Sequence, residues 1–215
     1  MTGRAADGAG TRSVLVVCTG NICRSPAAEL LLRARLAELG QHGVRVASAG
    51  TGARVGEPVA EPVAELLRAQ DVDPDGFAAR QLVPALVVGA DLVLTMTGAQ
   101  RSAVVAANPA ALRRTFTLRE FAGLAALVGP TVVDPAQPPA DRLAALVAAA
   151  PRGRGRRDAG PVHDDVPDPH RGPAEGYATA TGLVATAVDE LVAVLAGAPA
   201  GNRSPDRADP AGTFG

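Results

Sequence analysis

Short runs of aliphatic residues alternate along the chain with longer segments in which leucine, valine and alanine recur at helical spacing. The short runs predict four β-strands, at Ser13–Cys18, Gly43–Ala47, Asp91–Met96 and Arg114–Leu118. The longer segments predict helices at Ala27–Leu39, Glu57–Gln70 and Gln100–Ala107. The segment Gly182–Leu195 is predicted to belong to a final helix that begins near Pro173. This alternation predicts an α/β fold, a single doubly wound domain whose four-stranded parallel sheet is flanked by helices on both faces.

The same pattern sets the expected domain limits. Residues 13–197 are predicted to form one domain, between a disordered head at 1–12 and a disordered tail at 198–215. The pattern weakens over about residues 122–163, a proline-rich segment that we interpret as a partly mobile insertion with a short helix at Ala140–Ala150. The segment contains a run of four arginines, at Arg152, Arg154, Arg156 and Arg157. We interpret this run as part of a solvated linker rather than as a contact for an acidic partner.

Composition narrows the class of protein. The 215 residues are 47% hydrophobic, which is enough for a sizeable core, and the net charge of -1 disfavours electrostatic binding to nucleic acid or to a membrane. All 21 basic residues are arginines, so mechanisms that need a catalytic lysine are excluded. The first residues lack the apolar stretch of a signal peptide, and we expect a cytoplasmic protein with reduced thiols.

The candidate chemistry lies where the first predicted strand meets the first predicted helix, in the stretch Cys18-Thr19-Gly20-Asn21-Ile22-Cys23-Arg24-Ser25. Gly20 permits close backbone approach, and Asn21 tolerates the left-handed conformation. A turn of this kind points successive N–H groups at an anion, and the amino end of the helix adds partial positive charge. Arg24 supplies a planar fork for two phosphate oxygens. The loop therefore predicts a phosphate site.

The same positive field should favour the thiolate of Cys18, with Ser25 as a donor to the sulfur. One loop would then hold a phosphate and aim a nucleophile at its phosphorus, forming a covalent cysteinyl phosphate. An inert buried cysteine is the alternative, and the helix start at Ser25-Pro26 favours the phosphate site. The two cysteines have no histidine pair near them, so we expect no metal and no cofactor.

The run Val14–Glu29, which contains this loop, resembles the signature region of the low-molecular-weight protein-tyrosine phosphatases of bacterial type. Further similarities follow in the family's order, at Ser48-Ala49-Gly50-Thr51, Ala90–Thr97, Arg114–Glu120 and Val166-Pro167-Asp168-Pro169. The resemblance covers most of Ser13–Phe121 and Asp164–Leu195. It implies a cysteine-dependent phosphatase that hydrolyses protein phosphotyrosine.

The resemblance also implies roles for the matching residues. Cys18 would be the nucleophile, Arg24 the phosphate clamp and Asp168 the general acid. The residues implied to contact the substrate are Thr19, Gly20, Asn21, Ile22, Cys23, Arg24, Ser25 and His170. Those implied to support the loop are Asn21, Ser25 and Ser48. His170 either lines the mouth of the pocket or is an exposed loop residue.

Two further points concern single residues. A second Asp-Pro pair begins at Asp134, which we interpret as a turn former, because only the loop of Asp168 leads into the final helix as the family order requires.

Cys23 has two compatible interpretations. It either packs beneath the loop or forms a reversible disulfide that protects Cys18 from overoxidation, as the resemblance implies.

The chain departs from tyrosine-directed relatives at two positions that usually present aromatic walls to the substrate, where it has Gly52-Ala53-Arg54 and His170. Ile22, by contrast, is typical of tyrosine-directed members, since the related arginine phosphatases carry threonine there. The implied partner is a phosphotyrosine protein, such as one of a bacterial tyrosine kinase system, and the implied state is a monomer. A phosphatase for phosphoarginine or small phosphomonoesters is one alternative, and a non-catalytic module that binds phosphorylated ligands is another.

Overall fold

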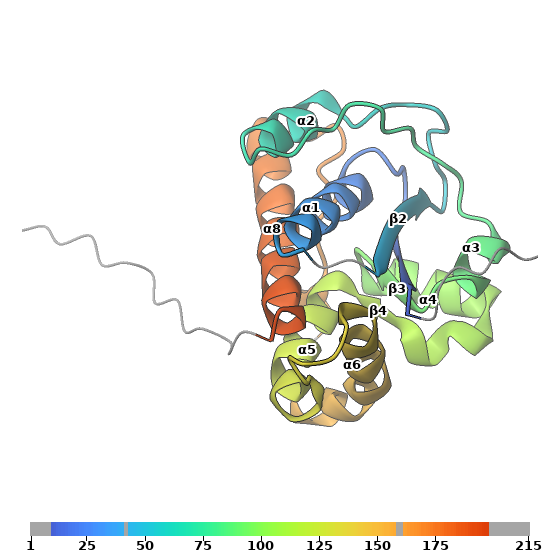
Figure 1. Cartoon of the computed structure of the whole chain (residues 1–215). Helices are drawn as coiled ribbons and strands as arrows, with labels where there is room; N and C mark the ends of the chain where they lie inside the picture. Colours follow the sequence, from blue (N-terminus) through green and yellow to red (C-terminus); the bar gives the residue numbers. More distant parts are fainter. Residues whose placement is uncertain (1–9, 41–42, 158–160, 198–215) are drawn as a thin grey trace, which may run out of the picture.

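The computed structural model describes residues 10–40, 43–157 and 161–197 (Figure 1). Its strands are β1 (Arg12–Cys18), β2 (Val44–Gly50), β3 (Leu92–Thr95) and β4 (Thr115–Thr117). Its helices are α1 (Arg24–Glu38), α2 (Glu61–Arg68), α3 (Pro84–Val88), α4 (Gly98–Ala107), η1 (Pro109–Arg114), α5 (Leu118–Val132), α6 (Pro139–Gly153), η2 (Arg154–Arg156), α7 (Pro161–Asp164) and α8 (Ala174–Leu195). The head and tail predicted to be disordered lie outside the described residues, apart from positions 10–12, where β1 already begins at Arg12.

The sheet is parallel throughout, in the order β2-β1-β3-β4. Its register aligns the carboxyl ends of the strands, since Cys18 pairs with Gly50, Val17 with Thr95, and Thr95 with Thr117. The chain runs from β1 outward to β2 and then returns past β1 to β3. The reversal makes the carboxyl end of β1 a topological switch point, which is where ligands bind in open parallel sheets.

Side chains of β1 alternate between two separate apolar layers. Val14 and Val16 face the larger layer, which is covered by α1, α2, α5 and α8, whereas Leu15 and Val17 face a smaller layer under α3 and α4. In Figure 1, α1 and α8 lie on one side of the sheet, and α3 and α4 lie on the other. The predicted α/β class, with a four-stranded parallel sheet between helices, is confirmed.

Helix boundaries differ from the prediction most clearly before α2. The predicted helix at Glu57–Gln70 is shorter in the structure, because α2 begins only at Glu61. Residues 51–60 instead form turns and irregular backbone, and several of them donate backbone hydrogen bonds to the loop that follows β1, among them Ala60 N–H to the Ile22 carbonyl at 2.8 Å. Tertiary hydrogen bonds have therefore replaced the first helical turn. The short helix α3 was not predicted.

The proline-rich segment is an integral part of the domain. The interpretation of residues 122–163 as a partly mobile insertion is wrong over the described positions, because α5 and α6 pack against each other and against α8 (Figure 1). Leu143 and Leu146 of α6 are fully buried in the larger core. Pro139 is the first residue of α6, where a helix tolerates proline. Pro130 and Pro151 lie inside the last turns of α5 and α6, close to where these helices end.

Two arginines of the predicted solvated linker are structural. Arg154 donates to Glu120 at 2.7 Å and stacks over the Phe116 ring, with 4.7 Å from its guanidinium carbon to the ring centroid. Arg157 forms a two-pronged pair with Asp164, at 2.8 and 2.5 Å. The linker interpretation is therefore wrong for these two residues, whereas Arg152 and Arg156 are exposed as expected.

The longest helix, α8, has the length and apolar composition of a membrane span, with a mean hydropathy of 1.5 over its best window. It packs against α1, α2 and α5, and half of that window is buried. Core helices pass the same length and composition test. We interpret α8 as the central core helix of the larger layer.

Candidate active site

The loop between β1 and α1 is a turn in which Asn21 adopts a φ of +56°. Asparagine tolerates this left-handed conformation better than most residues. Helix α1 begins at Arg24, and the preceding Cys23 forms no side-chain capping bond. The first N–H groups of α1 are therefore left for another acceptor, which is the arrangement that binds anions at helix amino ends.

The carbonyls of the same loop accept hydrogen bonds from the segment 51–60. Thr51 N–H donates to the Cys18 carbonyl, Gly52 N–H to that of Thr19, and Arg54 N–H to that of Gly20, each at 3.0 Å. Because these carbonyl oxygens are already occupied, they do not oppose an anion in the loop. This bracing was not predicted, since it joins segments that are more than 30 residues apart.

Close packing around Gly50 explains the glycine of the Ser48-Ala49-Gly50-Thr51 motif. A Cβ at this position would overlap the Thr19 carbonyl oxygen and would stand 3.0 Å from the Cβ of Asn21. Only glycine lets β2 end this close to the loop.

Cys18 lies at the bottom of the loop, with 2% of its surface exposed. Its Sγ lies 2.9 Å from Ser25 Oγ and accepts the Asn21 backbone N–H at 3.2 Å. Ser25 Oγ in turn accepts a hydrogen bond from Asn21 Nδ2 at 2.9 Å, which leaves the Ser25 hydroxyl proton for the sulfur. Both contacts can then donate to Cys18, an arrangement that suits a thiolate.

The hydrogen-bond chain continues behind the loop to a buried carboxylate. Asn21 Nδ2 also donates to Ser48 Oγ at 2.8 Å, and Ser48 donates to Glu29 Oε2 at 2.6 Å. Glu29 is 3% exposed and pairs with Arg33 at 2.9 Å. The roles predicted for Asn21, Ser25 and Ser48 stay predictions, and these contacts support them. Glu29 was not singled out in the sequence, although its position on α1, four residues before Arg33, was a signal that could have drawn attention to it.

Cys23, the second cysteine, is buried, and burial is the main cause that raises its pKa to about 12. The nearby Cys18 and Asp168 raise the pKa further. Cys23 is therefore a thiol at neutral pH and is unsuited to act as the nucleophile. Both cysteines are free.

Arg24 is buried and points its guanidinium toward the segment before α8. Its Nη1 donates to the Val166 carbonyl at 3.1 Å, and its Nη2 pairs with Asp168 Oδ2 at 2.6 Å. Its Nε is buried without a hydrogen-bond partner among the described residues. A phosphate oxygen would supply the missing acceptor, because buried donors are nearly always satisfied.

The loop that carries Asp168 is fixed by the two carboxylates before it. Asp164 pairs with Arg157, and Asp165 accepts the Gly98 N–H at 2.8 Å. Val166 N–H donates to the Met96 carbonyl at the end of β3, also at 2.8 Å. Asp168 itself remains half exposed. The competing Asp134 accepts the Ala136 N–H at 2.9 Å, which is the geometry of a turn former, and it does not line the pocket.

A hollow of about 230 Å³ lies over the loop. The predicted site residues that line it are Cys18, Thr19, Gly20, Ile22, Cys23, Arg24, Asp168 and His170. Gly52, Arg54 and Arg171 complete the lining. The side chains of Asn21, Ser25 and Ser48 are fully buried behind the loop instead. A thiol, a guanidinium and a carboxyl group thus share one pocket, and this combination suits phosphoryl transfer through a covalent intermediate.

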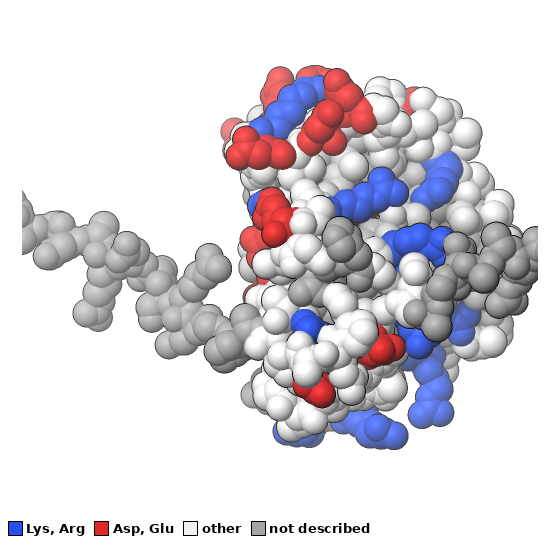
Figure 2. Space-filling view, viewed as in Figure 1, with Lys and Arg blue, Asp and Glu red and all other residues white. Residues whose placement is uncertain are grey.

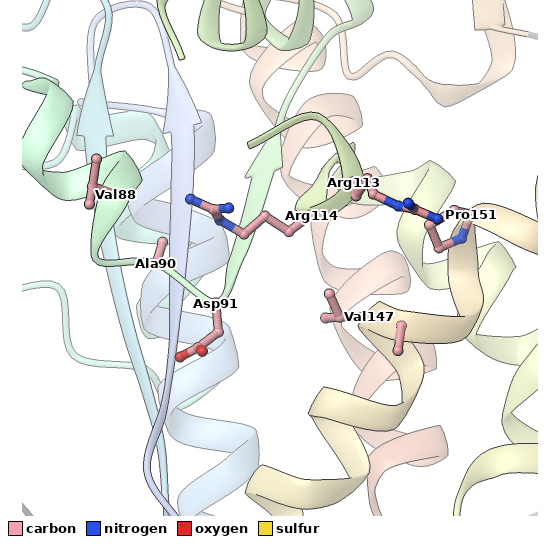
Figure 3. A pocket seen from close by; sticks show the side chains of 8 residues that line it. Val88, Ala90, Asp91, Arg113, Arg114, Val147 and Pro151 are labelled. Carbon is pink, nitrogen blue, oxygen red and sulfur yellow. The ribbon is translucent and has the colours of Figure 1, made fainter. Parts of the chain in front are cut away.

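A larger hollow of about 450 Å³ lies at the amino ends of β3 and β4, beside Asp91 and Arg114 (Figure 3). Arg113, Val88, Val147 and Pro151 also line it. Its lining contains no cysteine, serine or histidine, so this hollow lacks a nucleophile for the chemistry described above.

Comparison with known proteins agrees with the geometry. The family described as "Low molecular weight phosphotyrosine protein phosphatase" matches residues 13–149. A curated relative, the probable low molecular weight protein-tyrosine-phosphatase EpsP of Ralstonia nicotianae, is 42% identical over 110 residues, which are 51% of this chain and 72% of that protein.

Solved structures give the same result. A low molecular weight protein tyrosine phosphatase from T. tengcongensis superposes with a TM-score of 0.62 at 27% identity, over 85% of this chain and 98% of that one. The YwlE arginine phosphatase from Geobacillus stearothermophilus superposes with a TM-score of 0.61 at 28% identity, over 84% and 90%. With the family match spanning more than half of the sequence, the chain belongs to the low molecular weight phosphotyrosine protein phosphatase family, whose members are cysteine-dependent enzymes.

Proposed function

We propose that the chain hydrolyses phosphotyrosine on proteins through a cysteinyl-phosphate intermediate. The observation that carries this proposal is the meeting of Cys18, Arg24 and Asp168 in one pocket at the switch point of the sheet. The sulfur accepts two hydrogen bonds, the guanidinium has an unused buried donor, and the carboxyl group is half exposed. Each of the three groups is thus available for a separate task.

In the first step the Cys18 thiolate attacks phosphorus, the S–P bond forms and the P–O bond to the tyrosine breaks. Asp168, as the carboxylic acid, gives its proton to the leaving phenolic oxygen. Arg24 and the N–H groups of the loop stabilise the charge on the equatorial oxygens. The pair between Arg24 and Asp168 at 2.6 Å has to open at this stage, because the phosphate takes the place of the carboxylate on the guanidinium.

In the second step a water molecule attacks the phosphorus of the cysteinyl phosphate. The Asp168 carboxylate takes a proton from this water, the S–P bond breaks and the sulfur leaves as the thiolate. Inorganic phosphate departs, and the enzyme returns to its starting protonation state.

We further propose that the substrate is a protein of a bacterial tyrosine kinase system and that the enzyme acts as a monomer. The proposal extends to the compartment, since a nucleophilic thiol needs reducing conditions such as those of the cytoplasm. The curated relative EpsP is named a protein-tyrosine-phosphatase, and this name supports the choice of phosphotyrosine.

The test compares phosphotyrosine and phosphoarginine peptides, together with phenyl phosphate, on the wild type and on Cys18→Ser. We expect the wild type to hydrolyse the phosphotyrosine peptide best and Cys18→Ser to be inactive on all three. Acid-quenched wild type should retain ³²P on Cys18. Preference for phosphoarginine would overturn the substrate assignment, and a silent wild type that still binds the phosphopeptide would favour the non-catalytic module.

A further inference from the structure

The rim of the active-site hollow is basic at positions where tyrosine-directed relatives usually present aromatic walls. Arg54, from the segment after β2, and His170 and Arg171, from the loop of Asp168, line its mouth, and we call these three residues the basic rim. Arg54 and His170 are 116 positions apart and touch through Nη1 and Nε2 at 3.3 Å. Two distant segments therefore build this rim together.

Arg54 is held in place from several directions. Its backbone N–H donates to the Gly20 carbonyl at 3.0 Å, and its Nε donates to Glu57 Oε1 at 3.0 Å. Its Nη1 contact with His170 Nε2 holds the far end of the guanidinium. The side chain is nevertheless 41% exposed, so it is both oriented and accessible.

Arg171 is also placed by its backbone. It adopts a φ of +63°, a conformation that disfavours residues other than glycine, and its N–H donates to the Tyr177 hydroxyl at 3.1 Å. Backbone strain of this kind concentrates at functional sites. Its guanidinium forms no ion pair within the described part of the chain. Arg171 therefore presents an unpaired charge to the hollow.

The acidic groups near the hollow offset only part of this charge. Glu57 pairs with Arg54 at 3.0 Å, and Asp168 pairs with Arg24 deeper in the site, whereas Arg171 has no such partner among the described residues. The basic character is local, because the net charge of the chain is -1 and acidic side chains gather over α2 in Figure 2. A substrate that brings negative charge beside its phosphate would therefore find it complemented at the mouth.

We propose that the basic rim selects phosphotyrosine sequences with carboxylates next to the phosphorylated residue. This inference rests on the function proposed above and names the class of peptide. The phosphate occupies the loop under Arg24, and the flanking aspartate or glutamate side chains pair with Arg54 and Arg171. Such exposed ion pairs add modest affinity and speed the encounter of substrate with enzyme.

The test uses three phosphotyrosine peptides that differ only in the flanking residues: Asp and Glu, Asn and Gln, or Lys. For the wild type at low salt we expect kcat/KM to be about tenfold higher for the acidic than for the neutral peptide, since each exposed pair contributes up to about fivefold. The lysine peptide should be slowest. The ratio of acidic to neutral kcat/KM should shrink as salt is added, because screening weakens exposed pairs.

Variants assign the effect to the rim. Arg54→Gln and Arg171→Gln should each lower the acidic-to-neutral ratio, and the double variant should bring it close to one. Arg113→Gln, which removes an arginine beside the hollow at the other end of the sheet, should keep the wild-type ratio. Equal kcat/KM for the three peptides with the wild type would overturn the inference while leaving the proposed function intact. Failure to hydrolyse any of them would instead overturn the proposed function.

Discussion

One asparagine organises the catalytic loop at the scale of single residues. Asn21 has a left-handed backbone, its N–H reaches the Cys18 sulfur, and its side chain links Ser25 and Ser48. Its Oδ1 also accepts the Arg80 N–H at 2.8 Å, so all of its polar side-chain atoms are used. A residue with this many partners fixes the loop before any substrate arrives, and such preorganisation is what makes hydrogen-bond donors effective in catalysis.

Asp168 should control the rate according to the leaving group. We expect Asp168→Asn to lower kcat about 100-fold or more for alkyl and unsubstituted phenyl phosphates, which need a proton on the leaving oxygen. The loss should be much smaller for p-nitrophenyl phosphate, whose leaving group is stable without one. The measurement is kcat for a series of aryl phosphates.

The other Asp-Pro pair supplies the control for this experiment. Asp134 shapes a turn away from the pocket, and Asp134→Asn should leave the whole series unchanged. If this variant shows the steep dependence on the leaving group and Asp168→Asn does not, the general acid has been misassigned.

Cys23 should resist alkylation over a wide pH range. Burial raises its pKa to about 12, so the group is protonated below that pH, and at pH 8 only about one molecule in ten thousand carries the thiolate. We expect iodoacetamide at pH 7–9 to modify Cys18 and to spare Cys23 in the folded protein, as read by peptide mass spectrometry. Unfolded protein should be modified at both positions. Comparable modification of Cys23 in the folded protein at pH 8 would show that the thiol is not shielded.

At the scale of elements, the loop that carries Asp168 is bound to the end of the proline-rich segment. The two-pronged pair between Arg157 and Asp164 has side chains only 17% and 10% exposed. The hydrogen bond to Asp164 is the main cause that raises the pKa of Arg157. Arg157 Nη2 also contacts the Arg119 carbonyl of α5 at 3.4 Å. The last part of the segment thus positions the loop in which Asp168 lies four residues after Asp164.

Removal of the ion pair between Arg157 and Asp164 should affect both stability and catalysis. We expect Arg157→Gln to lower the free energy of unfolding by about 1–3 kcal/mol, because it leaves the Asp164 carboxylate unpaired and largely buried. It should also lower kcat about tenfold for substrates with poor leaving groups, because the proton donor is less well positioned. Denaturant unfolding and the aryl phosphate series measure the two effects.

Arg152 is the matched control, since it belongs to the same arginine run and is exposed. Arg152→Gln should change neither quantity. A loss of stability in Arg157→Gln with an unchanged dependence on the leaving group would mean that Arg157 supports the fold without positioning Asp168.

At the scale of the whole molecule, the structure makes one core from parts that the sequence pattern separates. Leu146 of α6 is fully buried, and it lies near Gly129 of α5, which also receives Val194 of α8. Arg142 of α6 is buried and donates to the Leu195 carbonyl at 2.7 Å and to the Pro135 carbonyl. The proline-rich segment therefore packs against the end of α8 as part of the larger core.

A cavity in α6 should consequently destabilise the entire domain. We expect Leu146→Ala to lower the free energy of unfolding by about 2–5 kcal/mol, the range for fully buried leucines. Leu112→Ala, at a leucine that is 49% exposed, should cost less than about 1 kcal/mol. Both are measured by denaturant unfolding with two spectroscopic probes. A change below about 1 kcal/mol for Leu146→Ala would mean that α6 folds independently of the core.

Much of this architecture was predictable because the signals are local. Each predicted strand overlaps an observed one. The strands β1 and β3 are short buried runs rich in valine and leucine, which can be recognised without their partner strands. The prediction of a helix start at Glu57 and the interpretation of the proline-rich segment as a mobile insertion were wrong for a different reason. In both places the conformation depends on contacts with distant segments, namely the loop after β1 and the core around α8.

The sequence by itself determined the loop that holds Cys18 and Arg24, because these residues are only six positions apart and the turn between them follows from local conformational preferences. The order of motifs along the sequence favoured Asp168 over Asp134, but only the tertiary structure brought Asp168 into contact with Arg24, 144 positions away in the chain. The tertiary structure also placed Arg157, predicted to be a linker residue, in a pair with Asp164, and it brought Arg54 into contact with His170. Such pairings depend on how the helices pack on the sheet, which no short stretch of residues specifies.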